Sequence, residues 1–560
     1  MTKYQGYDVT DATHETSIRN EWKTIVAKKK PVRGVTLTIG VFFDGTGNNR
    51  ENTASRLARF NKCSAPSQGV NQKDAQSCED FLKAINEDSL ANGSYRGYYS
   101  NIYWLNSLYI ADQTLSGCEE NAQIQTYISG IGTAAGKTDS TLGKGLGTSI
   151  LDLFEGVVTK TDEALEGITE ELLAFMKRNV QQDFCIAKIQ FDVFGFSRGA
   201  AAARHFANRV MEQDPAIASA IAQGLSGDYY DGKPSGEVRF LGIFDTVAAI
   251  GGISNFFDIN GRSNPGVNLE LRPSVAKKVF HITAMNEYRY NFSLNSIQGM
   301  WPELALPGAH SDIGGGYNPV GSPLQENENL FLCCPEFEIV SDDTRETDTR
   351  VYRNAEKARE MLLSLPALKH ILPHGKITTK TRSVVVIDNN QRRAGIIQKQ
   401  VGAAVFFERM AVPNDWANVC LRVMLDAAQE AGVLFTPIDP QNSDMKISFE
   451  LMPLADKAIA QGRAVRLGHE PLEFTEEERL LIGKYTHCSA HWNIESDRNV
   501  WVDPKTGEIF IHRFGPKEHK AFVFAHKPND HWVRSVWYMD DQQRLNDNAS
   551  KNDDALAANY

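Results

Sequence analysis

The 560-residue sequence has no long apolar run and no excess of positive charge. No stretch reaches about 18 apolar residues without a charged or strongly polar break, so we expect no transmembrane helix. The 59 Lys and Arg residues are outnumbered by 70 Asp and Glu residues, which gives a net charge of −11. A nucleic-acid-binding protein needs a basic face, so this acidic balance argues against one.

Cysteines are few, and a signal peptide is missing from the start of the sequence. Eight cysteines are too sparse for a disulfide scaffold, and no CxxC pair occurs. The adjacent Cys333 and Cys334 are expected to be buried thiols, whereas Cys63 and Cys78 would pair only in an oxidising compartment. Residues 1–17 lack a basic start followed by an apolar core. We therefore expect a cytoplasmic chain, or one that leaves by a route needing no such signal.

Apolar strand patterns alternate with helical patterns over the first half of the chain. Strands are expected at 35–43, 123–128, 185–196, 237–244 and 277–285, and helices near 99–110, 150–179 and 197–210. This alternation predicts an α/β fold with a mostly parallel sheet and helices on both faces.

Composition divides the chain into six regions. They are a polar N-terminal arm (1–32), an α/β core (33–323), an insertion or cap (324–415), a helical completion of the core (416–492), a β-rich C-terminal region (493–540) and a disordered tail (541–560). Residues 324–350 are acidic and are expected to form a loop. Beyond them we expect helices at 354–364 and 418–432, strands at 382–388 and 401–407, a capping box from Thr475 to Glu478 and a hairpin at 501–514.

The sharpest motif is Gly-Phe-Ser-Arg-Gly at residues 195–199. An apolar strand precedes it and an Ala-rich helix follows it, which is the context of a nucleophile elbow. Small residues are needed on both sides, because the elbow brings the strand and helix backbones close together. Ser197 is therefore the candidate nucleophile. The alternative is a plain Gly-rich turn in which Ser197 only caps the helix.

A serine nucleophile needs a base, normally a histidine that a carboxylate orients. In an α/β-hydrolase the order along the chain is Ser, then Asp or Glu, then His, on loops after later strands. Asp245 follows the strand at 237–244, and His310 lies in the later Pro-Gly-Ala-His segment, so both fit this order. The alternatives are that Asp245 only caps a turn and that His310 is an ordinary loop histidine.

The other histidines fit the role of base less well. His281 lies within a strand pattern and is expected in the core, and His205 lies on the helix after Ser197. His487 and His491 remain the rivals to His310. Asp192 lies inside the strand before Ser197 and should not reach the sheet edge.

Acyl transfer also needs two donors for the oxyanion. One is the backbone N–H of Arg198, the residue after the nucleophile. The other should come from the loop that follows the strand at 35–43, where Gly45 and Thr46 are the candidates.

Two other chemistries fit the same residues less well. An aspartyl-phosphate phosphatase would carry Asp where this chain has Phe42. A metal site from Asp44, Asp245, His310 and Asp312 lacks a fixed ligand spacing. Asp312 is more simply explained as a loop-orienting residue, and the serine mechanism needs no metal or organic cofactor.

Several segments together resemble a known family. They are FFDGTGNN, YISGIGT, GFSRGA, FDTV and PGAHSDIGGGY, in this order. The sequence is similar over 35–320, and more loosely over 418–492, to the α/β-hydrolase family that includes the first group of type VI secretion lipase effectors. The resemblance places the triad on Ser197, Asp245 and His310 and implies a phospholipase A acting on membrane phospholipid. It also implies a VgrG spike partner, a cognate immunity protein and delivery from the producing cytoplasm to the target periplasm.

The substrate stays open at this stage. The apolar segments 247–257 and 148–158 are either a lipid-facing lid or ordinary core helix. A soluble carboxylesterase or thioesterase is the alternative enzyme, and a non-catalytic adaptor on the spike is the alternative outside enzymes. The sequence does not decide between the sn-1 and sn-2 esters, although we favour sn-1.

Overall fold

A computed structural model describes residues 33–64, 97–111, 114–115, 120–133, 151–225, 232–248, 266–322, 330–386, 398–491, 500–502, 509–511 and 526–539. The arm at 1–32, the tail at 541–560, Cys78 and all but two residues of segment 247–257 lie outside these ranges. No described helix is long and apolar enough to cross a membrane.

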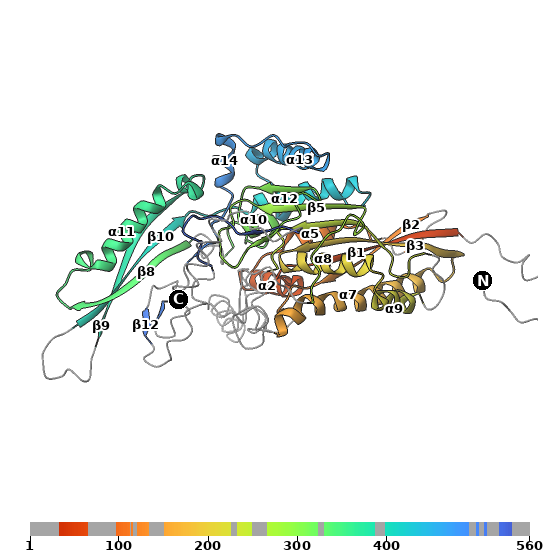
Figure 1. The fold of residues 1–560 in the computed structure, drawn as a ribbon, viewed down its shortest axis with the longest axis horizontal. Helices are drawn as coiled ribbons and strands as arrows, with labels where there is room; N and C mark the ends of the chain where they lie inside the picture. Colours follow the sequence, from red (N-terminus) through yellow and green to blue (C-terminus); the bar gives the residue numbers. More distant parts are fainter. Residues whose placement is uncertain are drawn as a thin grey trace, which may run out of the picture.

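Six parallel strands form the central sheet, in the order β2-β1-β3-β4-β5-β7 (Figure 1). Their bounds are β1 Arg33–Phe43, β2 Asn121–Ile128, β3 Phe184–Phe196, β4 Glu237–Phe244, β5 Lys278–Ala284 and β7 Glu303–Leu306. The five predicted strands are confirmed, as is the α/β fold class. Because every strand runs the same way, their carboxyl ends share one edge, where α/β proteins bind ligands.

Helices cover both faces of the sheet, which explains why its strands are apolar almost throughout. Alternate residues of β1 from Val35 to Phe43 join one buried cluster, and Phe42 joins the other. The first cluster is completed by α7 (Leu151–Arg178), α8 (Arg198–Met211) and α9 (Pro215–Gly224). The second is completed by α5 (Asn101–Leu108), α12 (Asp415–Glu430) and α13 (Met452–Arg466). Figure 1 shows α7 and α9 below the sheet and α12 and α13 above it.

The described end of the apolar segment 148–158 belongs to α7. Val157 is fully buried in the first cluster. This part of the segment is therefore core helix.

The loop predicted at 324–350 is wrong over its middle, because β8 (Leu330–Ser341) is a strand of 12 residues. Pro335 made this segment a poor candidate, since proline cannot donate to a ladder and is confined to edges and bulges. Both conditions hold: β8 is an edge strand, and its register shifts opposite Ala403 and Val405.

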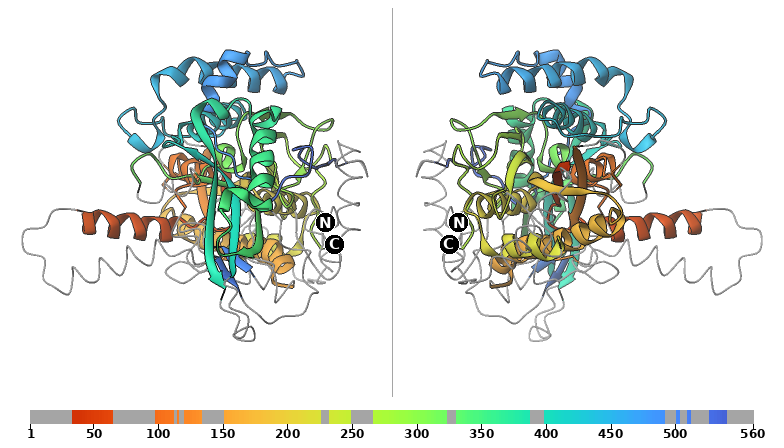
Figure 2. Two further views of the ribbon diagram at one scale, coloured as in Figure 1. Left: turned by 90° about the vertical axis from the view of Figure 1, so that its left-hand side faces the viewer. Right: turned by 90° about the vertical axis from the view of Figure 1, so that its right-hand side faces the viewer.

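A separate antiparallel sheet has the order β8-β10-β9, with β9 at Gly375–Val386 and β10 at Gln398–Arg409. Helix α11 (Arg350–Leu363) packs on it through a third buried cluster, which includes Val351, Val405 and Phe407. The left view of Figure 2 looks onto this unit.

Smaller elements complete the described chain. They are α2 (Arg50–Ser64), α10 (His310–Gly314), α14 (Glu476–Gly483), β6 (Leu294–Asn295), β11 (Val500–Val502), β12 (Ile509–Ile511), β13 (Val536–Trp537) and the 3₁₀ turns η4 (Glu346–Asp348), η5 (Pro366–Leu368), η6 (Leu372–His374), η7 (Ser443–Met445) and η8 (Phe449–Leu451). The predicted capping box is confirmed at α14, where the Thr475 and Glu478 side chains accept from each other's backbone N–H. Strands β11 and β12 pair antiparallel, as the predicted hairpin requires.

Candidate active site

Ser197 lies at the turn between β3 and α8, in a conformation that serine rarely adopts. Its φ is 59° and its ψ is −126°, and such backbone strain is typical of functional turns. The glycines beside it are required by close contact. A Cβ on Gly195 would lie 2.5 Å from the Gly199 carbonyl oxygen, and one on Gly199 would lie 2.3 Å from the Asp44 carbonyl oxygen. The turn thus has the geometry that the motif predicts for a nucleophile elbow.

Asp245 and His310 meet at the same edge of the sheet. Asp245 directly follows β4, and its N–H donates to the Ile282 carbonyl at the end of β5. His310 is the first residue of α10, shortly after β7. The His310 Nδ1 atom lies 2.5 Å from Asp245 Oδ2, so this hydrogen bond leaves Nε2 available for proton transfer.

Burial and neighbouring charges set the protonation of this pair. Burial raises the pKa of Asp245, but the Arg534 charge and the His310 hydrogen bond outweigh it and hold that pKa well below its usual range. Burial lowers the pKa of His310, and the attraction of Asp245 offsets it only in part. An ionised Asp245 beside a neutral His310 is the state a general base requires.

The Phe196 side chain packs against the candidate base, His310. This residue directly precedes Ser197, and its ring centroid lies 4.6 Å from that of His310. A Cβ on Gly314, in α10, would lie 2.0 Å from the same phenyl ring. The Phe292 ring contacts His310 edge-on at 4.9 Å, so the imidazole is held between two aromatic rings.

The loop after β1 lies beside the elbow, and its backbone donors are not equivalent. The Gly45 N–H donates to Asp44 Oδ1 at 2.7 Å and is already occupied. For the N–H groups of Thr46 and Arg198, no acceptor is found among the described residues. The Thr46 Oγ1 atom is also buried without a hydrogen-bond partner in the described part of the chain. Thr46 therefore brings unpaired polar atoms to this edge.

The rival residues have other partners. His281 is fully buried in β5 and lies between the Thr246 N–H and the Glu303 carboxylate. His487 pairs with Asp312, whose Oδ2 also accepts from the Ala309 N–H.

Asp192 is buried in β3, where it binds Arg239 and the Tyr109 hydroxyl. His205 accepts from the Asn268 N–H, and the His491 ring packs on His526. Within the described ranges, no group of three His, Cys, Asp or Glu side chains could hold a metal ion.

The sequence analysis missed two charged residues beside the pair. Glu287 is fully buried, accepts from the His310 N–H at 3.2 Å and forms a two-pronged ion pair with Arg289. Arg534 donates to both oxygens of Asp245. Neither lies in a motif that sequence spacing would reveal.

A family model and a solved structure match this chain. A family model described as "T6SS, Phospholipase effector Tle1-like, catalytic domain" matches residues 222–331, a range that contains Asp245 and His310. The chain is 79% identical to a solved structure described as the Tle1 effector bound to the VgrG spike from the type 6 secretion system. The match covers 96% of this chain and 100% of that chain, with a TM-score of 0.73.

A crystal structure of an uncharacterized protein from Pseudomonas aeruginosa is 16% identical, over 85% of this chain and 56% of that chain, with a TM-score of 0.32. No curated protein matches the chain.

Proposed function

Because the chain belongs to the family of Tle1-like phospholipase effectors of the type VI secretion system, we propose that it is a serine phospholipase A. In this proposal Ser197 is the nucleophile, His310 the general base and Asp245 the residue that orients the imidazole. The substrate is a membrane glycerophospholipid, and sn-1 is the favoured ester.

The observation that carries the proposal is the hydrogen bond from His310 to Asp245 at the sheet edge that also bears Ser197. The bond fixes one imidazole nitrogen, at 2.5 Å from Asp245 Oδ2. Ser197 directly follows the neighbouring strand β3 in a strained turn, and the ring of the preceding Phe196 packs against the His310 imidazole. These are the roles of a Ser-His-Asp triad in the chain order of α/β-hydrolases.

The first half-reaction transfers the acyl group to the enzyme. His310 Nε2 takes the Ser197 hydroxyl proton while Oγ bonds to the ester carbonyl carbon. The carbonyl oxygen gains negative charge, and in this proposal the backbone N–H groups of Arg198 and Thr46, for which no acceptor is found among the described residues, stabilise it. The ester C–O bond then breaks, His310 gives its proton to the departing oxygen, and lysophospholipid leaves.

The second half-reaction releases the fatty acid. A water molecule gives a proton to His310 and attacks the acyl carbonyl carbon. The bond to Ser197 Oγ breaks, and the proton returns from His310 to the serine. Asp245 stays ionised throughout, because its neighbours hold its pKa well below the usual range against the effect of burial.

The proposed route of delivery of this protein rests on its similarity to the solved effector structure. The 79% identical effector is described as bound to the VgrG spike, which supports a VgrG-type protein as the carrier of this chain. Delivery into the periplasm of a target bacterium and neutralisation by a cognate immunity protein, which the family resemblance implies, are part of the same proposal.

The test is fatty acid release from vesicles of phosphatidylethanolamine and phosphatidylglycerol, labelled separately at sn-1 and sn-2. The parent protein is compared with Ser197→Ala. Release by the parent alone supports the proposal and identifies the ester. If no lipid is cleaved while Ser197 still reacts with a fluorophosphonate, the enzyme is a soluble esterase. If neither occurs, the adaptor alternative replaces the proposal.

A further inference from the structure

The described C-terminal segment, residues 526–539, packs beside the core segment 290–296. Its strand β13 pairs parallel with β6, Val536 with Leu294 and Trp537 with Asn295. The N–H of Leu294 donates to the Ser535 carbonyl, and the N–H of Ser296 donates to the Trp537 carbonyl, each at 2.9 Å. These bonds fix the backbone directly after Arg534, and the Tyr290 N–H, which donates to the Lys527 carbonyl at 3.1 Å, holds the segment before it.

Arg534 extends from this segment to the candidate catalytic carboxylate. Its Nη1 lies 2.7 Å from Asp245 Oδ1, and its Nη2 lies 2.9 Å from Asp245 Oδ2. The Nε atom donates to the Phe292 carbonyl at 2.7 Å, so the guanidinium group is held by all three of its nitrogen atoms. The exposed fraction is 7% for the arginine side chain and 0% for the aspartate. A buried, two-pronged pair of this kind fixes orientation as well as charge.

Every position around the Asp245 carboxylate is thereby occupied. Oδ1 accepts from Arg534 and from the Ala284 N–H at 2.9 Å. Oδ2 accepts from Arg534 and His310. The carboxylate has little freedom to rotate, and the guanidinium compensates its charge.

We propose that Arg534 is a positioning residue of the reaction, which locks the Asp245 carboxylate and limits how strongly it raises the basicity of His310. The inference rests on the proposed function, because it assigns Arg534 a role through the triad. It makes the C-terminal segment part of the active site.

The charges around His310 determine in which direction its pKa should change when Arg534 is replaced. Asp245 and Glu287 favour the protonated imidazole, and Arg289 disfavours it. The Phe196 and Phe292 rings that contact the imidazole are uncharged, and the titratable His526 of the C-terminal segment lies beyond Phe292, with its ring 6.2 Å from the phenyl ring. Removing the Arg534 charge leaves Asp245 uncompensated in a buried place, which favours the protonated histidine. The pKa of His310 should then rise.

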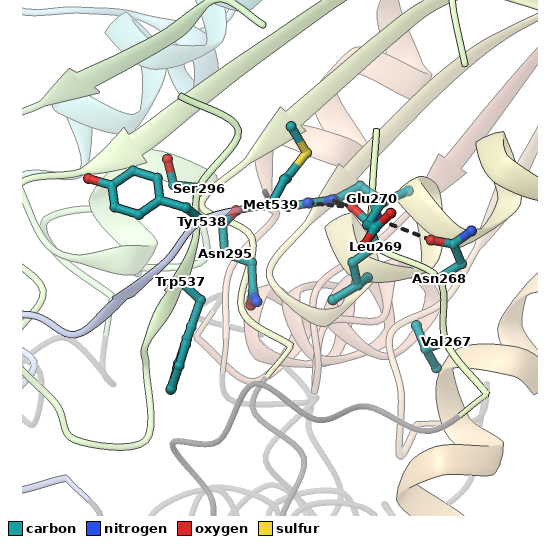
Figure 3. A pocket seen from close by; sticks show the side chains of 10 residues that line it. Val267, Asn268, Leu269, Glu270, Asn295, Ser296, Trp537, Tyr538 and Met539 are labelled. Atoms are coloured by element: carbon teal, nitrogen blue, oxygen red, sulfur yellow. Dashed lines mark hydrogen bonds between the residues drawn. The ribbon is translucent and has the colours of Figure 1, made fainter. Parts of the chain in front are cut away.

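Strand β6 also links the C-terminal segment to the nucleophile helix. Arg204 on α8 donates from Nη1 to the Asn295 carbonyl at 2.7 Å. The Asn295 side chain accepts from the Ala248 N–H, three residues after Asp245. Figure 3 shows Asn295 and Ser296 beside Trp537, Tyr538 and Met539, around a cavity of about 180 Å³. No triad residue lines this cavity, so we assign the contact a structural role.

The experiment measures kcat/KM between pH 5 and 9 on a soluble short-chain ester, with the full chain. The variants are Arg534→Gln, Arg534→Lys, Asp245→Asn and the double variant Asp245→Asn/Arg534→Gln. Asp530→Asn, an exposed position on the same segment, is the control. Thermal unfolding of each variant is measured in parallel.

Arg534→Gln should lower kcat/KM at pH 7 by about 10²-fold, as expected when a catalytic group is misplaced, and should move the acid limb to higher pH. Arg534→Lys keeps the positive charge but loses the two-pronged contact with Asp245. Its kcat/KM should therefore fall, while the acid side of its pH profile stays where it is in the parent. In the Asp245→Asn background, loss of Arg534 should cost no further rate, because residues that act together are not additive. Asp530→Asn should match the parent.

A parental rate and pH profile in Arg534→Gln would overturn the inference, as would additive losses in the double variant. If Arg534→Gln does not fold, two other variants still test the inference. The double variant removes both charges and should recover the melting temperature, and a parental kcat in Arg534→Lys would overturn the positioning role. If the parent cleaves no lipid, the phospholipase proposal fails alone, and the rate of fluorophosphonate labelling of Ser197 against pH decides the role of Arg534. A parent that is also not labelled overturns both.

Discussion

The Tyr127 hydroxyl donates to the Asp44 carboxylate, with 2.5 Å between Oη and Oδ2. Tyr127 lies on β2 and Asp44 directly follows β1, so the bond joins the ends of two neighbouring strands. The other oxygen of Asp44 accepts from Ser100 Oγ and from the Gly45 N–H. The loop that carries the candidate oxyanion donor Thr46 is therefore anchored through one buried carboxylate.

Tyr127→Phe should loosen this loop without emptying the space around the ring. A hydrogen bond stabilises a fold by about 1 kcal/mol, so we expect the melting temperature to fall, and the displaced loop should lower kcat/KM by roughly tenfold. Tyr352→Phe on α11, in the antiparallel unit, is the matched control and should leave both unchanged. A Tyr127→Phe enzyme with parental kcat/KM would show that Asp44 does not position the loop.

Gly130 tests the same loop by steric contact. A Cβ at this position would lie 1.8 Å from the Gly45 carbonyl oxygen, so Gly130→Ala must displace the loop backbone. We expect a loss of about 10²-fold in kcat, since small displacements of catalytic groups have effects of this size. Gly97→Ala, where the nearest atom is 3.7 Å away, should be tolerated. The prediction fails if Gly130→Ala retains its kcat, or if Gly97→Ala loses as much.

The pH profile should reflect the buried histidine. Only neutral His310 can accept the Ser197 proton, and burial lowers the pKa of His310 below its ordinary value. Activity should therefore persist into mildly acidic solution and decline only as the pH falls through that lowered pKa. The measurement is kcat/KM on a soluble ester, which avoids effects of pH on vesicles. An acid limb above pH 7 would contradict the expected direction.

Glu287 should stabilise the fold in a defined pH range. Burial raises the pKa of Glu287, but the charges of Arg289, Arg534 and His310 outweigh it and hold it at about 2. A depressed folded-state pKa gives stability above the unfolded value of about 4.3, which is lost as the pH falls toward 2. Glu287→Gln should therefore lower the free energy of unfolding by about 3 kcal/mol at pH 7.

That deficit should shrink below pH 4, because the carboxylate of the unfolded parent then takes up a proton while that of the folded parent, with a pKa of about 2, stays ionised. Urea unfolding at pH 7, 5 and 3.5 measures it. Glu473→Gln, at an exposed ion pair with Arg479, is the control and should change stability by less than about 1 kcal/mol. A deficit that is equal at all three pH values would mean that the charge of Glu287 is not responsible.

The sequence predicted the central sheet well because of how that sheet is covered. Strands buried on both faces are continuous apolar runs, and β3 and β4 stand out for this reason. Strand β8 carries acidic residues and Pro335 at an edge, so its composition resembles a loop. Ser197, Asp245 and His310 could be selected because each follows a strand in a known order.

No comparable sequence pattern predicts the contact between Arg534 and Asp245. The two residues are 289 positions apart, and the arginine lies in a polar and aromatic stretch without periodicity. Glu287 was missed for a similar reason: Arg289 is only two residues away, but the contact with the His310 N–H forms only when β5 and α10 are packed together. A local pattern reveals what a residue's own element does, but a buried ion pair depends on two elements at once.

The position of Arg534 in the chain also sets the order in which a ribosome supplies the parts of the site. Translation at about 5–20 residues per second delivers Arg534 on the order of 15–60 s after Asp245. If Arg534 locks the aspartate as proposed, a nascent chain already bearing the nucleophile, acid and base is still an incomplete enzyme. A product of premature termination in this interval would lack the arginine that locks Asp245.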